Sequence, residues 1–546
     1  MKKKLICSIS SLLLLGSVFA GGSASYASGT VTAGAGDNEV KNVILFVTDG
    51  TSLNAINLAR WYQGGKPLFI DKYFTGLSRT YATDSLTTDS AAGATALATG
   101  HKIKSETVSI LPDTITMPFI EATNKGEENK PLPTILEAAK LAGKGTGLVF
   151  TSELTDATPA VFASHAASRD FAESISEQMV YNGVDVLLGG GSDYLVPGKE
   201  ETNRTDGEDL TKVLKSNGYE YVTNKKDLLN TKTNKVWGLF QPEALDADFD
   251  LNPNEQPSLA EMTKVAIDKL STNEKGFFMM VEASQIDWFG HDNDPVGIIS
   301  EVLAFDKAFQ TAVEFAEKDG HTAVISTSDH ATGGLNMTNY DSMDDLRATL
   351  KGIKHTSYGI EGTINESNMV KVLKEEYGLT DLTKEEIAAV KKTLKNEENL
   401  SVVIGHMIGE RIGVSFSTED HTADEVGIFA YHPKNFKPTD FMQSGIIMNS
   451  DIGKYIQYVL GIDYSALEKT LFVSGEAFVK KGATVTIDKS NKLNPVIVVK
   501  KGSQLLKLPI DKNIAIMDGK TVQLNTLNLF IVSKTWVSQE AIDLIK

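Results

Sequence analysis

The feature that most constrains this chain is a set of short, continuous apolar runs. Val43–Val47 is the first of them, and it stops at the polar sequence Thr48-Asp49-Gly50. A run without alternating polar residues predicts a strand that is buried on both faces, as in a parallel sheet. The pattern recurs at Gly147–Phe150, Val186–Leu188, Phe277–Val281 and Thr322–Ser326.

Helical patterns lie between these runs, for example at Leu132–Leu141 and Leu259–Leu270. Strands that alternate with helices predict an α/β fold with a doubly wound, mostly parallel sheet flanked by helices. In such sheets, ligands bind beyond the carboxyl ends of the strands. The acidic residues expected at those ends are Asp49, Glu282, Asp287 and Asp329.

The two ends of the chain differ from the sheet-forming part. Residues 1–27 combine three lysines, an apolar stretch and small residues before a cleavage site, which is the layout of a secretory signal peptide. A retained anchor is disfavoured because the apolar stretch is short for a span of ~20 residues. Residues 28–38, rich in Gly, Ala, Ser and Thr, are expected to form a flexible leader. Residues 466–546 contain short Val/Ile/Leu-rich runs and predict a small β-rich C-terminal module.

Residues 39–465 therefore form the main predicted domain. Within it, residues 336–415 are rich in Lys and Glu, and Thr383-Lys384-Glu385-Glu386 fits a capping box at the start of a helix. We expect this stretch to be an inserted surface lobe whose charges form a solvated face rather than a binding patch. No later apolar run is long enough to span a bilayer, and the signal peptide predicts a secreted or cell-surface protein.

Charge and cysteine content exclude several classes of protein. The chain has 53 basic and 71 acidic residues, a formal charge of −18, so binding to the phosphate backbone of nucleic acids is disfavoured. Its single cysteine, Cys7, excludes an intramolecular disulfide and a Cys-rich zinc site. Cleavage after residue 27 would remove this cysteine and three lysines, leaving a mature chain of charge −21 without a thiol.

Aspartate and histidine residues give the strongest chemical signal. Together they are ligands that zinc takes through oxygen and imidazole nitrogen. Enough of them are present for two metal ions, which could clamp the attacking and leaving oxygens of a displacement at phosphorus. The candidates are Asp49, Asp287, His291, Asp329, His330 and His421. Taken alone, each Asp-His pair could equally be a surface ion pair or a satisfied core histidine.

A serine in a segment of small residues complements these ligands. Ala and Leu favour a helix from about Ala91, and Gly100 is a good terminator. Ser90 then lies at a helix N-terminus, where N–H groups and the helix dipole attract phosphate. A serine there could also be a simple N-cap, and its hydroxyl needs a base or a metal to become a strong nucleophile. Its occurrence together with the metal-type ligands favours the catalytic interpretation.

Separated segments of the sequence resemble those of bacterial alkaline phosphatases. The matching segments are Val47–Gly50, Thr88–Ala96, Asp156–Ala160 with Ser168-Arg169, Val281–His291, Ser328–His330 and Glu419–Thr422, in the family's order. The resemblance implies the alkaline phosphatase-like fold, with the insert as a crown-like lobe over the active-site entrance. It also implies hydrolysis of small phosphate monoesters, with broad specificity, through a phosphoserine intermediate.

The resemblance further implies a role for each site residue. Ser90 would attack phosphorus. A first zinc ion would be held by Asp287, His291 and His421, and a second by Asp49, Asp329 and His330. A magnesium ion would be held by Asp49, Thr158 and Glu282, an oxygen-only set that suits a hard octahedral cation. Asp156 would orient the waters of that ion from outside its ligand shell.

Two further residues are expected to contact or support the phosphate. Arg169 would grip two phosphate oxygens with its planar fork, and Asp89 would steady Arg169 by an ion pair. Trp288 departs from many family members, which carry a Lys or His there that reaches the phosphate through water. Tryptophan has one N–H donor and no charge, so we expect weaker retention of product phosphate and a shifted pH profile.

Three functional hypotheses remain from the sequence. The favoured one is a secreted alkaline phosphatase with two zinc ions and one magnesium ion. The alternatives are a phosphodiesterase or sulfatase of the same superfamily, and a surface-binding protein with a decayed site. The last is motivated by the C-terminal module, which loosely resembles the N-terminal-like domain of copper amine oxidases and could serve cell-surface attachment. Because the family is commonly dimeric, a homodimer is also expected.

Overall fold

The computed structural model describes residues 40–338, 349–396 and 399–546. The predicted signal peptide and leader therefore lie outside the described residues. Among the described residues, no helix combines the length and the apolar character needed to cross a membrane.

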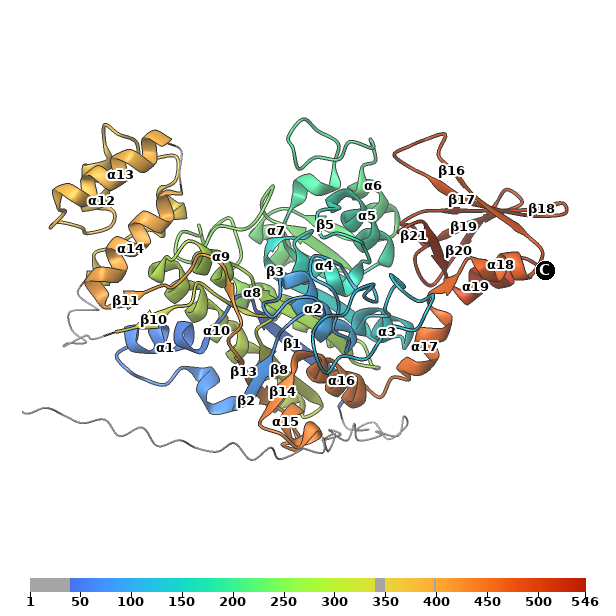
Figure 1. Ribbon diagram of the computed structural model, residues 1–546, viewed down its shortest axis with the longest axis horizontal. Helices are drawn as coiled ribbons and strands as arrows, with labels where there is room; N and C mark the ends of the chain where they lie inside the picture. Colours follow the sequence, from blue (N-terminus) through green and yellow to red (C-terminus); the bar gives the residue numbers. More distant parts are fainter. Residues whose placement is uncertain (1–39, 339–348, 397–398) are drawn as a thin grey trace, which may run out of the picture.

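The centre of the fold is a ten-stranded sheet with the order β14-β2-β13-β8-β1-β7-β3-β4-β6-β5 (Figure 1). Its strands are β1 (Asn42–Thr48), β2 (Phe74–Arg79), β3 (Gly145–Glu153), β4 (Val186–Gly190), β5 (Glu220–Val222), β6 (Val236–Leu239), β7 (Phe277–Ala283), β8 (Thr322–Thr327), β13 (Val426–Tyr431) and β14 (Ile446–Met448). All neighbouring pairs are parallel except those of β13, which runs against β8 and β2. The mostly parallel sheet is confirmed, and the five apolar runs form its adjacent strands β8, β1, β7, β3 and β4.

Helices cover both faces of this sheet, and β1 shows why its sequence is continuously apolar. Ile44 and Phe46 pack into the core on one face, whereas Val43 and Leu45 pack into the core on the other. The first face carries α1 (Leu53–Tyr62), α8 (Leu259–Leu270) and α10 (Pro295–Asp319). The second carries α2 (Ser90–Thr99), α3 (Ile135–Leu141), α4 (Ala157–Ala163), α5 (Ala172–Asn182) and α16 (Asn449–Leu460). The predicted doubly wound arrangement is therefore present.

One of the predicted helices begins later than its pattern indicated. The helix expected over Leu132–Leu141 starts at Ile135, because Pro133 disfavours a helical backbone at Leu132 and the extended Thr134 forms a capping box. The Thr134 hydroxyl accepts from the Glu137 N–H at 3.1 Å, and the Glu137 carboxylate accepts from the Thr134 N–H at 3.0 Å. Helix α8 has the predicted bounds and begins with the same device at Ser258.

The lobe predicted at residues 336–415 stands at one end of the molecule, coloured yellow to orange in Figure 1. Its described ends meet in a two-stranded antiparallel pair of β10 (Asn336–Met337) and β11 (Val414–Ser415). Between them lie α12 (Met369–Glu375), α13 (Lys384–Asn396) and α14 (Leu400–Ile412). The capping box predicted at Thr383 is confirmed, because Thr383 and Glu386 exchange hydrogen bonds of 2.7 and 3.1 Å.

The C-terminal residues form the opposite end of the molecule, coloured red in Figure 1. A five-stranded antiparallel sheet consists of β16 (Thr484–Asp488), β17 (Val496–Lys501), β18 (Gln504–Pro509), β19 (Ile514–Met517) and β20 (Lys520–Gln523). A smaller sheet consists of β15 (Val473–Ser474), β22 (Lys534–Val537) and β21 (Leu529–Ile531). Leu529 and Trp536 of this smaller sheet pack into the same core as α5 and α16. Apolar packing is thus continuous across the boundary predicted at residue 466, and that boundary stays a prediction.

Candidate active site

The carboxyl ends of three adjacent strands bring the predicted acidic residues together. Asp49 follows β1, Asp329 follows β8 by two residues, and Glu282 is the penultimate residue of β7. Val47 of β1 pairs with Glu282 on one side and with Thr327 of β8 on the other. The edge of the sheet where ligands were expected is therefore the place where these carboxylates meet.

A glycine allows the chain after β1 to approach the neighbouring site residues. Gly50 has φ +65°, and a Cβ on it would lie 2.5 Å from Asp287 Oδ1. Its N–H points at Asp329 Oδ1, 3.3 Å away. Asp287 comes from the short helix α9 (Gln285–His291), which follows β7. Only a residue without a side chain lets β1 and α9 place Asp49 and Asp287 side by side.

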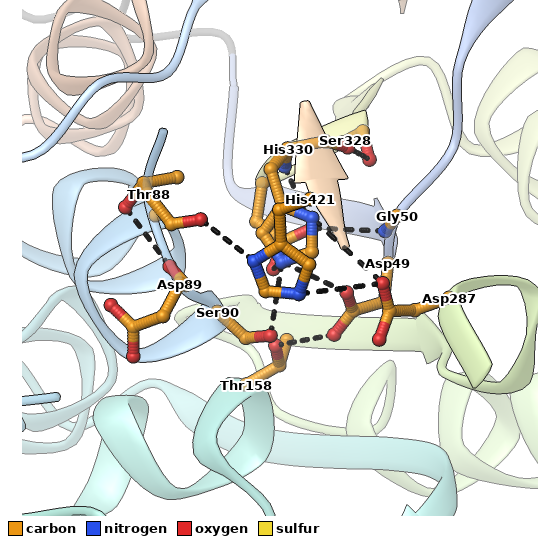
Figure 2. A network of polar contacts seen from close by, with 12 residues as sticks. Asp49, Gly50, Thr88, Asp89, Ser90, Thr158, Asp287, Ser328, His330 and His421 are labelled. Atoms are coloured by element: carbon orange, nitrogen blue, oxygen red, sulfur yellow. Dashed lines mark hydrogen bonds and ion pairs between the residues drawn. The ribbon is translucent and has the colours of Figure 1, made fainter. Parts of the chain in front are cut away.

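Ser90 is the first residue of α2, and its side chain points toward His330 and His421 (Figure 2). Its Oγ lies 3.1 Å from His330 Nε2, and Ser90 is buried. The helix is capped by Asp89, whose carboxylate accepts from the N–H groups of Ala91 and Ala92 at 3.1 and 3.2 Å. The alternative that Ser90 is only an N-cap is therefore wrong, since its neighbour fills that position and leaves the hydroxyl free to face the site.

Two histidines are oriented so that their outer nitrogens converge. His291 Nδ1 bonds to the Glu419 carbonyl, and His421 Nδ1 bonds to the Thr88 carbonyl at 2.8 Å. A carbonyl only accepts, so each Nδ1 must carry the proton. The Nε2 atoms of His291 and His421 then face each other at 3.1 Å, and Asp287 Oδ2 lies 3.3 Å from the first of them. Such an arrangement suits a cation between the three side chains.

The second group of candidate ligands is fully buried. His330 Nε2 lies 3.4 Å from Asp329 Oδ2 and 3.6 Å from Asp49 Oδ1. Both carboxylate oxygens are buried without a hydrogen-bond partner. Ligand atoms around a tetrahedral zinc ion with bonds of about 2.0–2.1 Å are separated by about 3.3–3.4 Å. The spacing and the unpartnered oxygens therefore fit a metal ion of this kind.

The pKa values show the electrostatic cost of gathering these buried charges. Burial, reinforced by Asp287, raises the pKa of Asp329 to about 8. Burial and the charges of Asp329 and Asp287 raise the pKa of Asp49 well above its usual range. Although burial opposes it, the hydrogen bond to Asp287 raises the pKa of His291 to about 9. A divalent ion would favour the ionised carboxylates and displace the histidine proton.

A third group offers only oxygen atoms. Thr158 Oγ1 lies 3.1 Å from Asp49 Oδ2, on the side of Asp49 away from His330. Glu282 bonds through Oε2 to Ser152 Oγ at 3.3 Å, while its Oε1 is buried without a partner. Burial, followed by the charge of Asp156, raises the pKa of Glu282 well above its usual range. This oxygen set fits a hard cation better than it fits zinc.

Arg169 is held between two carboxylates. It contacts Asp89 at 3.5 Å, as the sequence predicted, and Asp156 at 3.0 Å, which the sequence did not predict. Despite burial, the charges of Asp156 and Asp89 raise its pKa above the usual value. Asp156 also caps α4 by accepting from the Ala157 N–H at 2.7 Å. One quarter of the Arg169 side chain stays exposed, so its outer face is available to an anion.

The sequence missed some residues that support the site and left one untested. Thr332 bonds through Oγ1 to Asp287 and lies 3.2 Å from His330 Nδ1, so it joins the two groups of candidate ligands. Its only signal in the sequence is its position two residues after His330. Trp288 is half-buried on α9, and its role toward phosphate stays a prediction.

Comparisons with known proteins agree with this geometry. The sequence model of the alkaline phosphatase family matches residues 40–462. Alkaline phosphatase 3 of Bacillus subtilis is 37% identical over 459 residues, covering 81% of this chain and 93% of that protein. The repressible alkaline phosphatase of Saccharomyces cerevisiae is 34% identical over 479 residues, covering 78% of this chain and 82% of its own.

Solved structures agree with the sequence relatives. The crystal structure of Thermus thermophilus alkaline phosphatase superposes with a TM-score of 0.69 at 25% identity, over 81% of this chain and 96% of that one. From the match over most of its length, we conclude that the chain belongs to the alkaline phosphatase family of phosphoric monoester hydrolases.

Proposed function

We propose that the protein is a secreted alkaline phosphatase that hydrolyses phosphate monoesters of broad specificity through a phosphoserine at Ser90. The observation that carries this proposal is the position of Ser90 Oγ. It lies at the first turn of α2, 3.1 Å from His330 Nε2, beside two converging groups of metal-type ligands. A hydroxyl placed at a helix N-terminus can attack a phosphate that the positive end of the helix dipole attracts.

The residues present fit two zinc ions and one magnesium ion. We assign Asp287, His291 and His421 to one zinc ion, and Asp49, Asp329 and His330 to the other. We assign Asp49, Thr158 and Glu282 to magnesium, with Asp156 outside the ligand shell. The unpartnered oxygens of Asp49, Asp329 and Glu282 support this assignment. When bound, the zinc ions would supply Lewis acidity that lowers the pKa of the serine hydroxyl and of a water molecule.

The reaction then needs two displacements at phosphorus. In the first, a bond forms between Ser90 Oγ and phosphorus while the bond to the substrate alcohol breaks, and the proton lost by Ser90 ends on the alcohol. In the second, water attacks phosphorus, the Ser90 bond breaks, and Ser90 recovers a proton as inorganic phosphate leaves. Arg169 holds two non-bridging oxygens through both steps, while Asp89 and Asp156 fix the plane of its guanidinium.

Substitution of Ser90 tests the nucleophile. We expect Ser90→Ala to lower kcat for an aryl phosphomonoester by several orders of magnitude while metal analysis returns the zinc content of the wild type. Trapping with a ³²P-labelled monoester at acidic pH should label the wild type and leave the variant unlabelled. Wild-type turnover in the variant would refute the mechanism.

The alternatives within the superfamily are separated by substrate and metal. A monoester carries one more negative charge than a diester, and Arg169 is placed to bind it. We therefore expect faster hydrolysis of the aryl monoester than of the matching diester or sulfate ester, and loss of activity on chelation. A faster diester or sulfate reaction would favour the alternative function.

Secretion rests on residues 1–27 alone and predicts a mature N-terminus at Ser28. The homodimer and surface attachment stay predictions.

A further inference from the structure

The C-terminal module presents one tight turn to the main domain. Residues 510–513 connect β18 to β19, and Asp511 in this turn has φ +63°. The buried Asn528 holds the turn from inside the module by donating to the carbonyls of Lys512 and Ile514 at 2.7 and 2.9 Å. Asp511 and Lys512 are therefore presented by a rigid turn rather than by a free loop.

Lys512 enters a group of acidic side chains on the main domain. Its Nζ lies 2.8 Å from Glu177 of α5 and 2.6 Å from Glu208, and 5.0 Å from the centre of the Tyr181 ring. Only 14% of the Lys512 side chain is exposed. Glu177, Glu208 and Asp206 lie close enough to hold a metal ion. Lys512 supplies the positive charge instead, so the module is docked by a largely desolvated ion pair.

Asp511 reaches α5 beside this lysine. Its carboxylate accepts from Ser174 Oγ at 2.7 Å and from Gln178 Nε2 at 3.0 Å. The Gln178 side chain in turn accepts from the His165 N–H at 2.8 Å and donates to the His165 carbonyl at 3.0 Å. A single side chain of α5 therefore connects the module to the backbone of His165.

The segment that begins at His165 ends at the phosphate-binding arginine. This segment is also held by the backbone of the loop that follows α2. Ala166 and Val108 exchange hydrogen bonds of 2.9 and 3.0 Å, and the Arg169 N–H donates to the Glu106 carbonyl at 2.9 Å. Gln178, which Asp511 orients, supplies a further restraint through the backbone of His165.

We propose that the C-terminal module is a positioning element for Arg169, which acts through the contacts of Asp511 and Lys512 with α5 and of Gln178 with His165. Asp511 and Lys512 are positioning residues, because they act only through other side chains. The proposal rests on the role of Arg169 proposed above. The family model ends at residue 462, before the module begins, so the device is additional to what the family match describes.

The test is made on the full-length, zinc-loaded enzyme with inorganic phosphate as the probe. We expect Asp511→Ala to raise the Ki of phosphate and the KM of an aryl monoester by about two- to thirtyfold, with the zinc content unchanged. Asp511→Asn, which keeps one acceptor oxygen, should restore part of the affinity. The matched control is Lys534→Met, because Lys534 makes an exposed contact with Glu128 at 3.4 Å across the same boundary. This control should leave the Ki unchanged.

A double-mutant cycle separates positioning from general destabilisation. If Asp511 acts through Arg169, Asp511→Ala should have no further effect on the phosphate Ki once Arg169→Ala is present. An equal effect in both backgrounds would overturn the proposal, as would an unchanged Ki in Asp511→Ala. Lys512→Met should shift the Ki in the same direction, and it replaces Asp511→Ala if that variant fails to fold. If Arg169→Ala alone leaves the Ki unchanged, the failure lies with the proposed role of Arg169.

Discussion

At the scale of single residues, the backbone of Gly50 sets the tightest constraint on the site. A methyl group there would lie 2.5 Å from Asp287 Oδ1 and 2.6 Å from the Asp287 Cα, in a conformation with φ +65°. Gly50→Ala must therefore displace Asp287 or the end of β1. We expect kcat/KM for an aryl monoester to fall about 10²-fold, the effect of a misplacement of about 1 Å. The zinc content should fall as well.

The control for this prediction is a glycine that also has a positive φ but has open space where a Cβ would lie. Gly482 has φ +81°, and nothing lies within 4 Å of the position of its Cβ. Gly482→Ala should cost about 1–2 kcal/mol in stability through its left-handed conformation and leave kcat/KM unchanged. A Gly50→Ala enzyme with wild-type zinc content and turnover would show that the close approach to Asp287 is dispensable.

The candidate ligand residues could be predicted from the sequence, whereas the residues that support them could not. Asp49 and Asp329 were predicted because ligands bind beyond the carboxyl ends of parallel strands, and His330 because Asp and His together are zinc-type ligands. Thr332 and the pairing of Asp156 with Arg169 were not predicted. Hydroxyl and carboxylate side chains are common in loops and at helix starts that belong to no functional site. A local pattern identifies a residue type in an unusual place, but a partner distant in sequence is set by the fold.

At the scale of elements, helix α2 depends on a residue that also holds Arg169. The Asp89 carboxylate caps the helix through two N–H groups and lies 3.5 Å from the Arg169 guanidinium. Asn is a good N-cap but carries no charge. We expect Asp89→Asn to weaken phosphate inhibition with little change in Tm. Asp89→Ala should weaken it similarly and also destabilise the protein by about 1 kcal/mol. An equal loss of Tm in both variants would contradict this division of roles.

The central strands could be predicted from the sequence, but the edge beyond them could not. The five apolar runs occupy adjacent positions because a strand with helices on both faces must be apolar throughout. Strand β2 has buried and exposed residues, because helices cover this part of the sheet less completely. It pairs with β13 and β14, which lie about 350 residues later in the sequence. No local periodicity carries the identity of such a distant partner, so the order at this edge came from the structure alone.

At the scale of the whole molecule, the C-terminal module is joined to the main domain by both apolar and charged contacts. Phe472, in the connection to the module, packs its ring 4.6 Å from the ring of the buried His165. Leu529 and Trp536 extend the apolar contact, and Lys512 adds the charged one. The short Val/Ile/Leu-rich runs after residue 466 indicated a separate module, because such runs report local secondary structure. A local pattern cannot show that Lys512 pairs with Glu177 and Glu208, which lie over 300 residues earlier in the sequence.

This docking gives stability a dependence on pH. Burial, opposed by Lys512 and reinforced by Asp511, raises the pKa of Glu177 to about 8, while Glu208 shares the charge of Lys512. The pKa of a glutamate in the unfolded chain is about 4.3. The folded state therefore retains a proton that the unfolded state has lost over this interval. The contribution of Glu177 to the free energy of unfolding falls as pH rises toward about 8, by at most about 1.4 kcal/mol per unit, and is constant above it.

Glu177→Gln should remove this dependence, because a neutral carboxamide resembles the protonated acid and can still accept from Lys512 and donate to Glu208. The measurement is Tm of the zinc-loaded wild type and variant from pH 6 to pH 9. The other groups around Lys512 should not produce the same change. Burial raises the pKa of Asp511 to about 6, so Asp511 is ionised over most of this pH range, and Asp206 and Tyr181 titrate outside it. We expect the wild type to lose Tm relative to the variant up to about pH 8 and the difference to level off above it. Glu128→Gln, in the exposed pair with Lys534, should follow the wild type. A parallel decline in wild type and Glu177→Gln would show that Glu177 is ionised throughout, with Lys512 neutralising it fully in the folded protein.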